Sequence, residues 1–124
     1  MKKITIVDDE EVVLKMLSTM IQREGFYVET AVNGKDALKI IKKNKPDLVV
    51  TDLMMPEKEG IELIKDLKAL YKDIKIIAIS GGNKHFDPSI QLKSAQYLGA
   101  DASFSKPLDR QEFISAIKTL LDKN

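Results

Sequence analysis

Apolar residues along the chain follow two alternating patterns. Short runs that are almost entirely apolar are typical of β-strands covered on both faces, and apolar residues at three- and four-residue spacings predict amphipathic helices. The predicted strands lie at 4–7, 27–30, 48–50, 74–79 and 102–105, the last being the weakest. The predicted helices carry the apolar residues Val13, Met16, Leu17, Met20 and Ile21; Ala37, Leu38, Ile40 and Ile41; Ile61, Ile64, Leu67 and Leu70; the segment 90–98; and Phe113, Ile114, Ile117, Leu120 and Leu121.

Glycine and proline mark several boundaries of these elements. Gly25 is predicted to end the first helix and Gly99 the fourth, because glycine readily adopts the left-handed conformation that closes a helix. Asn33-Gly34 predicts a turn before the second helix. Pro46 ends that helix, since the residue before a proline disfavours helical dihedral angles.

Strict alternation of buried strands with helices favours a parallel sheet that is covered by helices on both faces. Right-handed crossovers then favour an open, doubly wound α/β fold. A closed barrel of eight strands would need about twice the 124 residues present. We expect a single domain over residues 1–124 that stands alone, without repeats, linkers or a separate output domain.

Composition narrows the class of protein. The chain has no cysteine, which excludes disulfides and thiol catalysis, and its one histidine, His85, excludes a multi-histidine zinc site. The net charge of +1 gives no general attraction to nucleic acid, so we expect no direct DNA binding. No apolar run is long enough for a membrane span or a signal peptide. We therefore expect a cytoplasmic protein without membrane insertion.

Polar residues with chemical potential follow four of the five predicted strands. Asp8 and Asp9 follow the first strand, Asp52 the third, Ser80 the fourth and Lys106 the fifth. In open parallel sheets, ligands bind beyond the carboxyl ends of the strands, where the strand order reverses. The second strand ends without an ionisable residue, as expected for a strand away from that point. The sequence thus predicts that three carboxylates, a hydroxyl and a lysine meet at one edge.

These residue types indicate a metal-bound phosphoryl site. Crowded carboxylates repel each other unless a cation lies among them, and all-oxygen ligands favour Mg²⁺, Mn²⁺ or Ca²⁺. A lysine and a hydroxyl could bind the remaining phosphoryl oxygens. One of the carboxylates is then available as a nucleophile.

The chain resembles the receiver domain of bacterial two-component response regulators, over essentially its whole length. The ordered motifs are Ile-Val-Asp-Asp-Glu at 6–10, Asn-Gly-Lys-Asp-Ala-Leu at 33–38, Asp-Leu-Met-Met-Pro at 52–56 with Gly60, Ile-Ser-Gly at 79–81, Leu-Gly-Ala-Asp at 98–101 and Lys-Pro at 106–107. The resemblance implies a flavodoxin-like (βα)5 fold with strand order 2-1-3-4-5. It also implies a phosphorylation-driven switch, not an enzyme, with any self-phosphorylation or self-dephosphorylation being part of the switch.

The resemblance further implies a role for each site residue. In that family a phosphoryl group passes from a phosphohistidine, on a sensor histidine kinase or a histidine phosphotransfer protein, to an aspartate matched here by Asp52. The implied cofactor is Mg²⁺, with Mn²⁺ as a substitute. The residues that match its ligands are Asp9, Asp52, the backbone carbonyl of Met54 and, through water, Asp8.

Two further residues match the part of the site that responds to phosphorylation. Ser80 matches the hydroxyl that moves onto the phosphoryl group, and Lys106 matches the conserved lysine, with a cis bond expected to Pro107. The changed state is expected to act on a downstream protein through the face of the fourth helix, fifth strand and fifth helix. The sequence does not identify that target.

The sequence departs from the family pattern in two places. The family pattern has an aromatic residue three positions before the lysine, but this chain has Ser103 there. The neighbouring aromatic residue, Phe104, is expected to face the other way, because successive side chains of a strand point to opposite faces of the sheet. The segment between Ser80 and Lys106 is a few residues longer than the pattern, with the excess at 81–88. We therefore predict that this loop, which holds His85 and Phe86, takes over the role of the aromatic switch.

Alternative interpretations remain open at this point. Asp8 or Asp9 could cap the first helix, and Ser80 could be ordinary turn chemistry. A pseudo-receiver that only binds partners is a second hypothesis. A metal-dependent phosphatase with an aspartyl nucleophile is a third, although such enzymes resemble a strand ending Asp-x-Asp and the acids here are adjacent.

Overall fold

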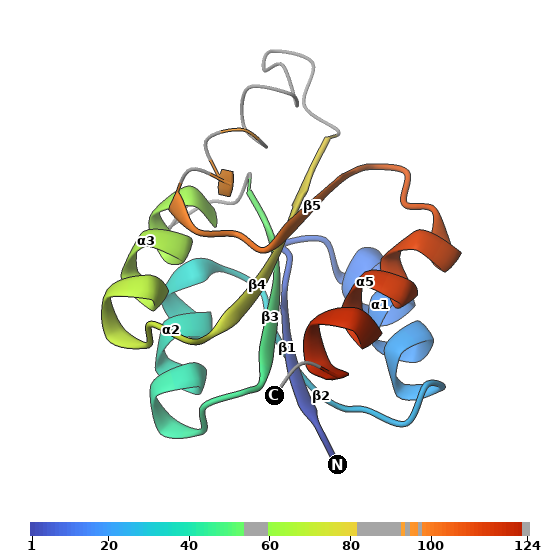
Figure 1. Ribbon diagram of the computed structural model, residues 1–124, viewed down its shortest axis with the longest axis horizontal. Coiled ribbons are helices and arrows are strands. Elements are labelled where there is room, and N and C mark those ends of the chain that lie inside the picture. Colours follow the sequence, from blue (N-terminus) through green and yellow to red (C-terminus); the bar gives the residue numbers. More distant parts are fainter. Residues whose placement is uncertain (54–59, 82–92, 94, 97, 123–124) are drawn as a thin grey trace.

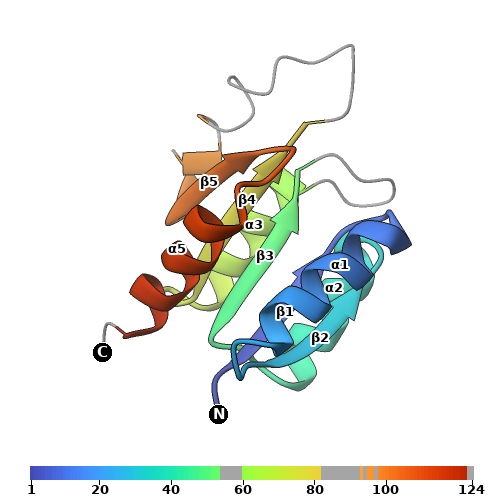
Figure 2. The same ribbon diagram turned by 90° about the vertical axis from the view of Figure 1, so that its right-hand side faces the viewer.

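The computed structural model describes residues 1–53, 60–81, 93, 95–96 and 98–122, and the statements below refer to these residues. Five strands form one parallel sheet in the order β2-β1-β3-β4-β5. They are β1 (Lys3–Val7), β2 (Tyr27–Ala31), β3 (Leu48–Asp52), β4 (Lys75–Ser80) and β5 (Ala102–Ser105). The predicted doubly wound fold and its strand order are confirmed (Figure 2).

Helices cover both faces of the sheet. The described helices are α1 (Glu11–Gln22), α2 (Gly34–Lys43), α3 (Gly60–Leu70) and α5 (Arg110–Asp122). Figure 1 shows α2 and α3 on one face and α1 and α5 on the other. Each face has its own core, in which Ile41 and Leu67 lie on the first side and Leu17 and Phe113 on the second. The predicted continuous apolar strands fit this arrangement, because both their faces are covered.

Two of the apolar residues that marked the predicted amphipathic helices lie outside the buried faces. Met16 is 49% exposed, and the buried face of α1 is formed by Leu14, Leu17 and Ile21. A helix turns about 100° per residue, so Met16 lies roughly 200° around the axis from Leu14. Leu70, also 49% exposed, is the last residue of α3, five residues before β4 begins.

The predicted turn at Asn33-Gly34 is the start of α2. Asn33 has extended dihedral angles, and its Oδ1 accepts the backbone N–H of Asp36 at 2.8 Å. It is therefore an N-cap residue, a role that asparagine fills as readily as that of a turn residue. The helix ends before Pro46, as predicted.

Parts of three predicted segments lie outside the described residues. They are Met54 and Met55 after β3, the loop residues 82–88 with His85 and Phe86, and most of the predicted helix 90–98. Within that helix, residues 93, 95, 96 and 98 are helical. Gly99 follows with a φ of 117°, consistent with its predicted role as a helix stop. In the part of the chain that is described, no helix has the length and apolar character needed to cross a bilayer.

Candidate functional site

The sheet register brings the predicted polar residues to one edge. Val7 of β1 lies beside Thr51 of β3, so Asp8 and Asp52 follow on neighbouring strands. Ser80 of β4 lies beside Ser105 of β5, which places Lys106 directly after it. The backbone N–H of Lys106 continues the pairing by donating to the Ser80 carbonyl at 2.8 Å.

Most of these polar residues are buried although they are charged or hydroxylated. Asp8 is 1% exposed, Asp52 3% and Ser80 0%, whereas Asp9 is exposed at the rim of the site. Carboxylates are seldom buried this deeply unless a cation compensates them. Burial therefore distinguishes this edge from an ordinary set of loop residues.

Lys106 is the cation that compensates the buried carboxylates. Its ammonium Nζ lies 3.3 Å from Asp8 Oδ2 and 3.3 Å from Asp52 Oδ2. A third carboxylate, Glu10, places its Oε1 3.5 Å from the same Nζ. The lysine side chain is 19% exposed, so these ion pairs are partly screened from water. Lys106 thus joins the ends of β1, β3 and β5 through a single ammonium group.

The electrostatics leave Asp8 under-compensated. Burial raises the pKa of the Asp8 carboxyl, although the hydrogen bond from the Glu10 N–H and the nearby Lys106 act in the opposite direction. For Lys106, burial alone would lower the pKa, but the Asp52 and Asp8 carboxylates outweigh it and raise the pKa. The lysine is therefore held as an ammonium ion, while the acidic side of the site favours further positive charge.

The acidic residues after β1 form a group that could hold a metal ion. Carboxylate oxygens of Asp8, Asp9 and Glu10 lie within 4.8 Å of one another. Sequence reasoning named the first two as ligand candidates and missed Glu10, although the Asp-Asp-Glu motif contains it. Asp52 is linked to this group through Lys106, which contacts both Asp52 and Asp8.

The first helix is not capped by either aspartate in the expected way. Glu10 is the N-cap residue of α1, and its side chain makes no capping hydrogen bond. Asp8 Oδ1 instead accepts the N–H of Glu10 at 2.9 Å, one residue before the helix begins. This bond orients the Asp8 carboxylate so that its second oxygen faces Lys106.

Gly60 fixes the backbone that carries Asp52. A Cβ atom added at Gly60 would lie 2.1 Å from the Asp52 carbonyl oxygen, and the Gly60 N–H donates to the Leu53 carbonyl at 3.1 Å. Only glycine allows the start of α3 to approach β3 so closely. The glycine noted in the sequence motif therefore has a packing reason at the site.

The end of β4 is packed just as closely against Lys106. Gly81 has a φ of 135°, and a Cβ there would lie 3.1 Å from the Lys106 Cβ. The peptide bond between Lys106 and Pro107 is cis, as expected. Any side chain larger than hydrogen at residue 81 would therefore press on the lysine.

On β5, Ser103 and Phe104, the residues of the first departure from the family pattern, have clear structural partners. Ser103 Oγ accepts a hydrogen bond of 2.8 Å from the Gln96 side-chain amide. Phe104 points to the opposite face, where its ring packs edge-to-face on Phe113 with centroids 5.7 Å apart. The prediction that Phe104 cannot replace an aromatic at 103 is therefore supported by the direction of its side chain.

Comparison with known proteins places this geometry in a family. A family model described as the response regulator receiver domain matches residues 4–118. The chain is 36% identical over 123 residues to the alkaline phosphatase synthesis transcriptional regulatory protein PhoP of Bacillus subtilis, covering 99% of this chain and 50% of that protein. It is 33% identical over 120 residues to sporulation initiation phosphotransferase F of the same organism, covering 97% of this chain and 94% of that protein.

A solved structure shows the same fold. It is the response regulator protein TrrA of Thermotoga maritima in complex with Mg²⁺ and BeF, 32% identical, with a TM-score of 0.82. The match covers 97% of this chain and 99% of TrrA. The chain spans half the length of PhoP and nearly all of phosphotransferase F, so it corresponds to the part that these proteins share. Together with the match to the family model, these similarities show that the chain belongs to the response regulator receiver domain family.

Proposed function

We propose that this chain is a phosphorylation-driven signalling switch whose receiver domain spans residues 1–124. It accepts a phosphoryl group on Asp52 from a phosphohistidine of a sensor histidine kinase or a histidine phosphotransfer protein in the cytoplasm, and then binds a downstream protein differently. The observation that carries the proposal is the approach of two buried carboxylates, Asp8 and Asp52, to Lys106 Nζ at 3.3 Å each.

The transfer requires a nucleophile, an acceptor for charge and a leaving group. An oxygen of the Asp52 carboxylate forms the new O–P bond as the histidine N–P bond breaks, and the imidazole nitrogen keeps that electron pair. Lys106, at the end of the outer strand, can donate to an oxygen of the phosphoryl group. Ser80 ends β4, which lies between the strand of Asp52 and the strand before Lys106, and its hydroxyl can bind another oxygen of the phosphoryl group.

The donor set fits Mg²⁺, for which Mn²⁺ can substitute. The side chains proposed as metal ligands are all carboxylates, whose oxygens suit this ion. Oxygens of Asp8 and Asp9 belong to the acidic group whose members lie within 4.8 Å of one another. We assign Asp9, Asp52 and the carbonyl of Met54 as ligands, with Asp8 acting through water; Met54 lies outside the described residues. When bound, the ion offsets the negative charge of the carboxylates and of the phosphoryl oxygens. The Mg²⁺ and BeF in the TrrA structure support the choice of Mg²⁺ as the metal.

The response is proposed to reach the surface through the outer half of the sheet. Ser80 ends β4 and Lys106 follows β5. A movement of either residue would therefore first shift β5, α5 and the segment 90–98 that precedes β5. The partner that reads this face is a protein. The names of the relatives, one a transcriptional regulator and one a phosphotransferase, show that receiver domains with similar sequences serve different outputs.

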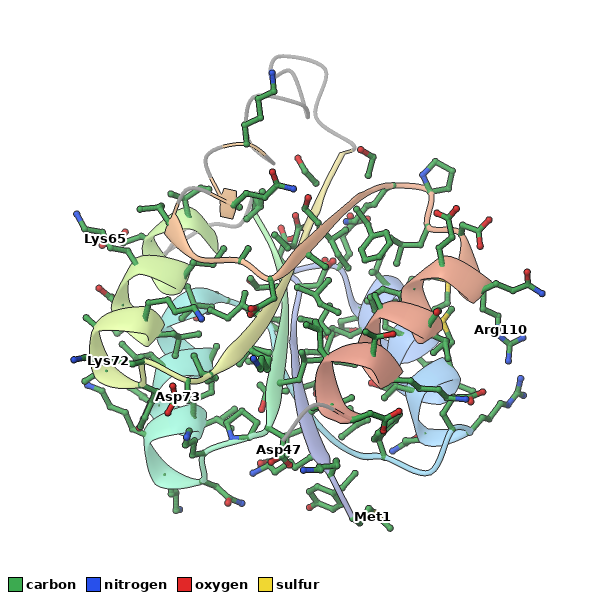
Figure 3. The ribbon with its side chains drawn as sticks, viewed as in Figure 1. Met1, Asp47, Lys65, Lys72, Asp73 and Arg110 are labelled. Carbon is green, nitrogen blue, oxygen red and sulfur yellow. The ribbon has the colours of Figure 1, made fainter. Side chains whose placement is uncertain are left out.

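Phosphorylation of Asp52 can be tested directly. The protein is incubated with acetyl phosphate, or with a phosphorylated kinase, in the presence and absence of Mg²⁺. We expect one phosphoryl group per chain, stable in acid and labile in base, that forms only with the metal and is absent from Asp52→Asn. Asp73→Asn is a matched control, because Asp73 lies at the opposite edge of the sheet (Figure 3). Equal labelling of Asp52→Asn would overturn the assignment.

A partner-binding measurement and a phosphatase assay distinguish the alternatives. A pseudo-receiver would bind its partner equally well with Asp52 intact or replaced by asparagine. A phosphatase would release inorganic phosphate from a phosphate monoester with many turnovers. The proposed nucleophile, Asp52, ends the third strand and not the first, which favours the switch over the phosphatase.

A further inference from the structure

Glu10 is the least buried of the carboxylates that contact Lys106. Its side chain is 63% exposed, whereas those of Asp8 and Asp52 are 1% and 4% exposed. Its Oε1 lies 3.5 Å from Lys106 Nζ, slightly farther than the 3.3 Å of the other two. Of the three contacts, the one with Glu10 can therefore be broken with the least loss of packing and hydrogen bonding.

The backbone position of Glu10 gives its side chain this freedom. Glu10 is the N-cap of α1, where serine, threonine, aspartate or asparagine would bond the first helical N–H groups. Its carboxylate makes no such bond and extends to Lys106 instead. Asp8, by contrast, is held by the Glu10 N–H at 2.9 Å and cannot turn away without losing that bond.

A phosphoryl group on Asp52 would compete with Glu10 for the same ammonium. The phosphoryl group brings about two negative charges to the carboxylate nearest Lys106. The Glu10 carboxylate then occupies an N–H donor of Lys106, and its negative charge repels the oxygens of the phosphoryl group. Since Glu10 is exposed, it can rotate into water and leave Lys106 to the phosphoryl group.

Building on the proposed function, we propose that Glu10 is a displaceable counter-ion of Lys106. Its charge raises the affinity of the site for a metal cation and lowers its affinity for a phosphoryl anion. Its charge adds to the acidic group formed with Asp8 and Asp9 and so strengthens metal binding. The same charge weakens the hold of the site on a phosphoryl group, because it must leave Lys106 first. Glu10 is thus a positioning residue for Lys106.

The test uses Glu10→Gln, which keeps the shape and removes the charge. Amide NMR titrations measure the affinity for Mg²⁺ alone, and then the affinity for beryllofluoride at saturating Mg²⁺. We expect the variant to bind Mg²⁺ about two- to fivefold more weakly and beryllofluoride about two- to fivefold more tightly, the range that one exposed ion pair supplies. Glu11→Gln is the matched control, because Glu11 carries the same charge one residue further on and is exposed at the start of α1. We expect it to change either affinity by less than about 1.5-fold.

Opposite shifts distinguish this role from a structural one. A variant with a damaged site would lose affinity for both ligands, and a pure effect of net charge would be equally large in Glu11→Gln. Either result, or an unchanged affinity for beryllofluoride, would overturn the inference. In a Lys106→Ala background, Glu10→Gln should change the affinity for beryllofluoride less than in the wild type; an equal change would also contradict the role. If the wild-type protein binds no beryllofluoride with Mg²⁺, it is the proposed function that fails.

Discussion

The two strands that frame the site differ in how firmly the fold holds them. β3, at the centre of the sheet, is buried at all of its positions and carries Asp52. β5, at the edge, has only partly buried or exposed residues and leads to Lys106. Central strands with neighbours on both sides open only at a high free-energy cost, whereas edge strands move more easily. Asp52, the proposed nucleophile, is therefore held firmly, and Lys106, which is proposed to respond to its phosphorylation, follows a strand that moves more easily.

The same contrast separates the two halves of the site chemically. The inner half, at the ends of β1 and β3, is acidic and suited to a cation. The outer half, at the ends of β4 and β5, supplies a hydroxyl and an ammonium that suit phosphoryl oxygens. Substitutions in the inner half should therefore abolish phosphorylation, and those in the outer half should uncouple phosphorylation from the response.

The largest expected difference is between Asp9→Ala and Lys106→Ala. Without the Asp9 ligand, the rate of phosphorylation should fall at least about a hundredfold, because the metal no longer offsets the charge of the phosphoryl group. Lys106→Ala should keep Mg²⁺ binding, since it removes a cation from the acidic half, but lose the changes in β5 and α5. Acetyl phosphate labelling measures the rate of phosphorylation, and amide NMR with Mg²⁺, and then with beryllofluoride, measures metal binding and the response of β5 and α5.

Either variant could break the comparison. Wild-type phosphorylation of Asp9→Ala would show that the metal shell is assigned wrongly. Beryllofluoride-induced shifts in residues 102–122 that persist in Lys106→Ala would show that the outer half does not depend on the lysine. In the wild type, the beryllofluoride-induced shifts over the whole chain should concentrate in residues 80–110, and a response confined to α2 and α3 would contradict the proposed route.

A second prediction concerns the packing that fixes Asp52. Gly60→Ala should lower the free energy of unfolding by at least about 2 kcal/mol, because its Cβ meets the Asp52 carbonyl and must displace backbone. The change should also move Asp52, the proposed nucleophile, so the rate of phosphorylation should fall. Thermal unfolding and acetyl phosphate labelling measure the two effects.

Gly25→Ala is a fitting control for this substitution. Gly25 has a φ of 93° but nothing within 4 Å of an added Cβ, so alanine meets strain without a clash. The expected cost is about 1 kcal/mol, with unchanged labelling. A smaller loss of stability in Gly60→Ala than in Gly25→Ala would mean that α3 can withdraw from β3.

Much of this architecture could be predicted because the strand pattern determines it. Continuous apolar runs indicated strands buried on both faces, and the residues after them were confirmed to lie at one edge. The buried face of α1 was predicted less well, since this helix has more apolar residues than it buries. The predicted pattern included Met16, which is 49% exposed, and left out Leu14, which is buried, because three- and four-residue spacings within the helix fit either choice.

Glu10 and Gln96 could not be predicted, for a different reason. Each acts through a side chain that reaches a partner distant in sequence, Lys106 for the first and Ser103 for the second. Local patterns gave Glu10 no role beside the two aspartates, and it stands at an N-cap position that its side chain does not use. The partner of Ser103 depended on the orientation of a helical segment relative to β5, which no periodicity specifies.

The smallest expected effect is at the bond between Gln96 and Ser103, and it would sharpen the account of the outer half. This hydrogen bond of 2.8 Å ties the helical segment before Gly99 to β5 where an aromatic is the family pattern. A neutral, exposed hydrogen bond contributes about 1 kcal/mol or less, so Gln96→Ala and Ser103→Ala should each change the beryllofluoride affinity by less than about fivefold.

Because Gln96→Ala and Ser103→Ala remove the same hydrogen bond, the double variant should match either single one in a double-mutant cycle. Ser103→Tyr should have a larger effect, since a ring at this position displaces the Gln96 amide. Strictly additive single effects would show that the two residues act independently, and an unchanged Ser103→Tyr would place the coupling elsewhere in the backbone.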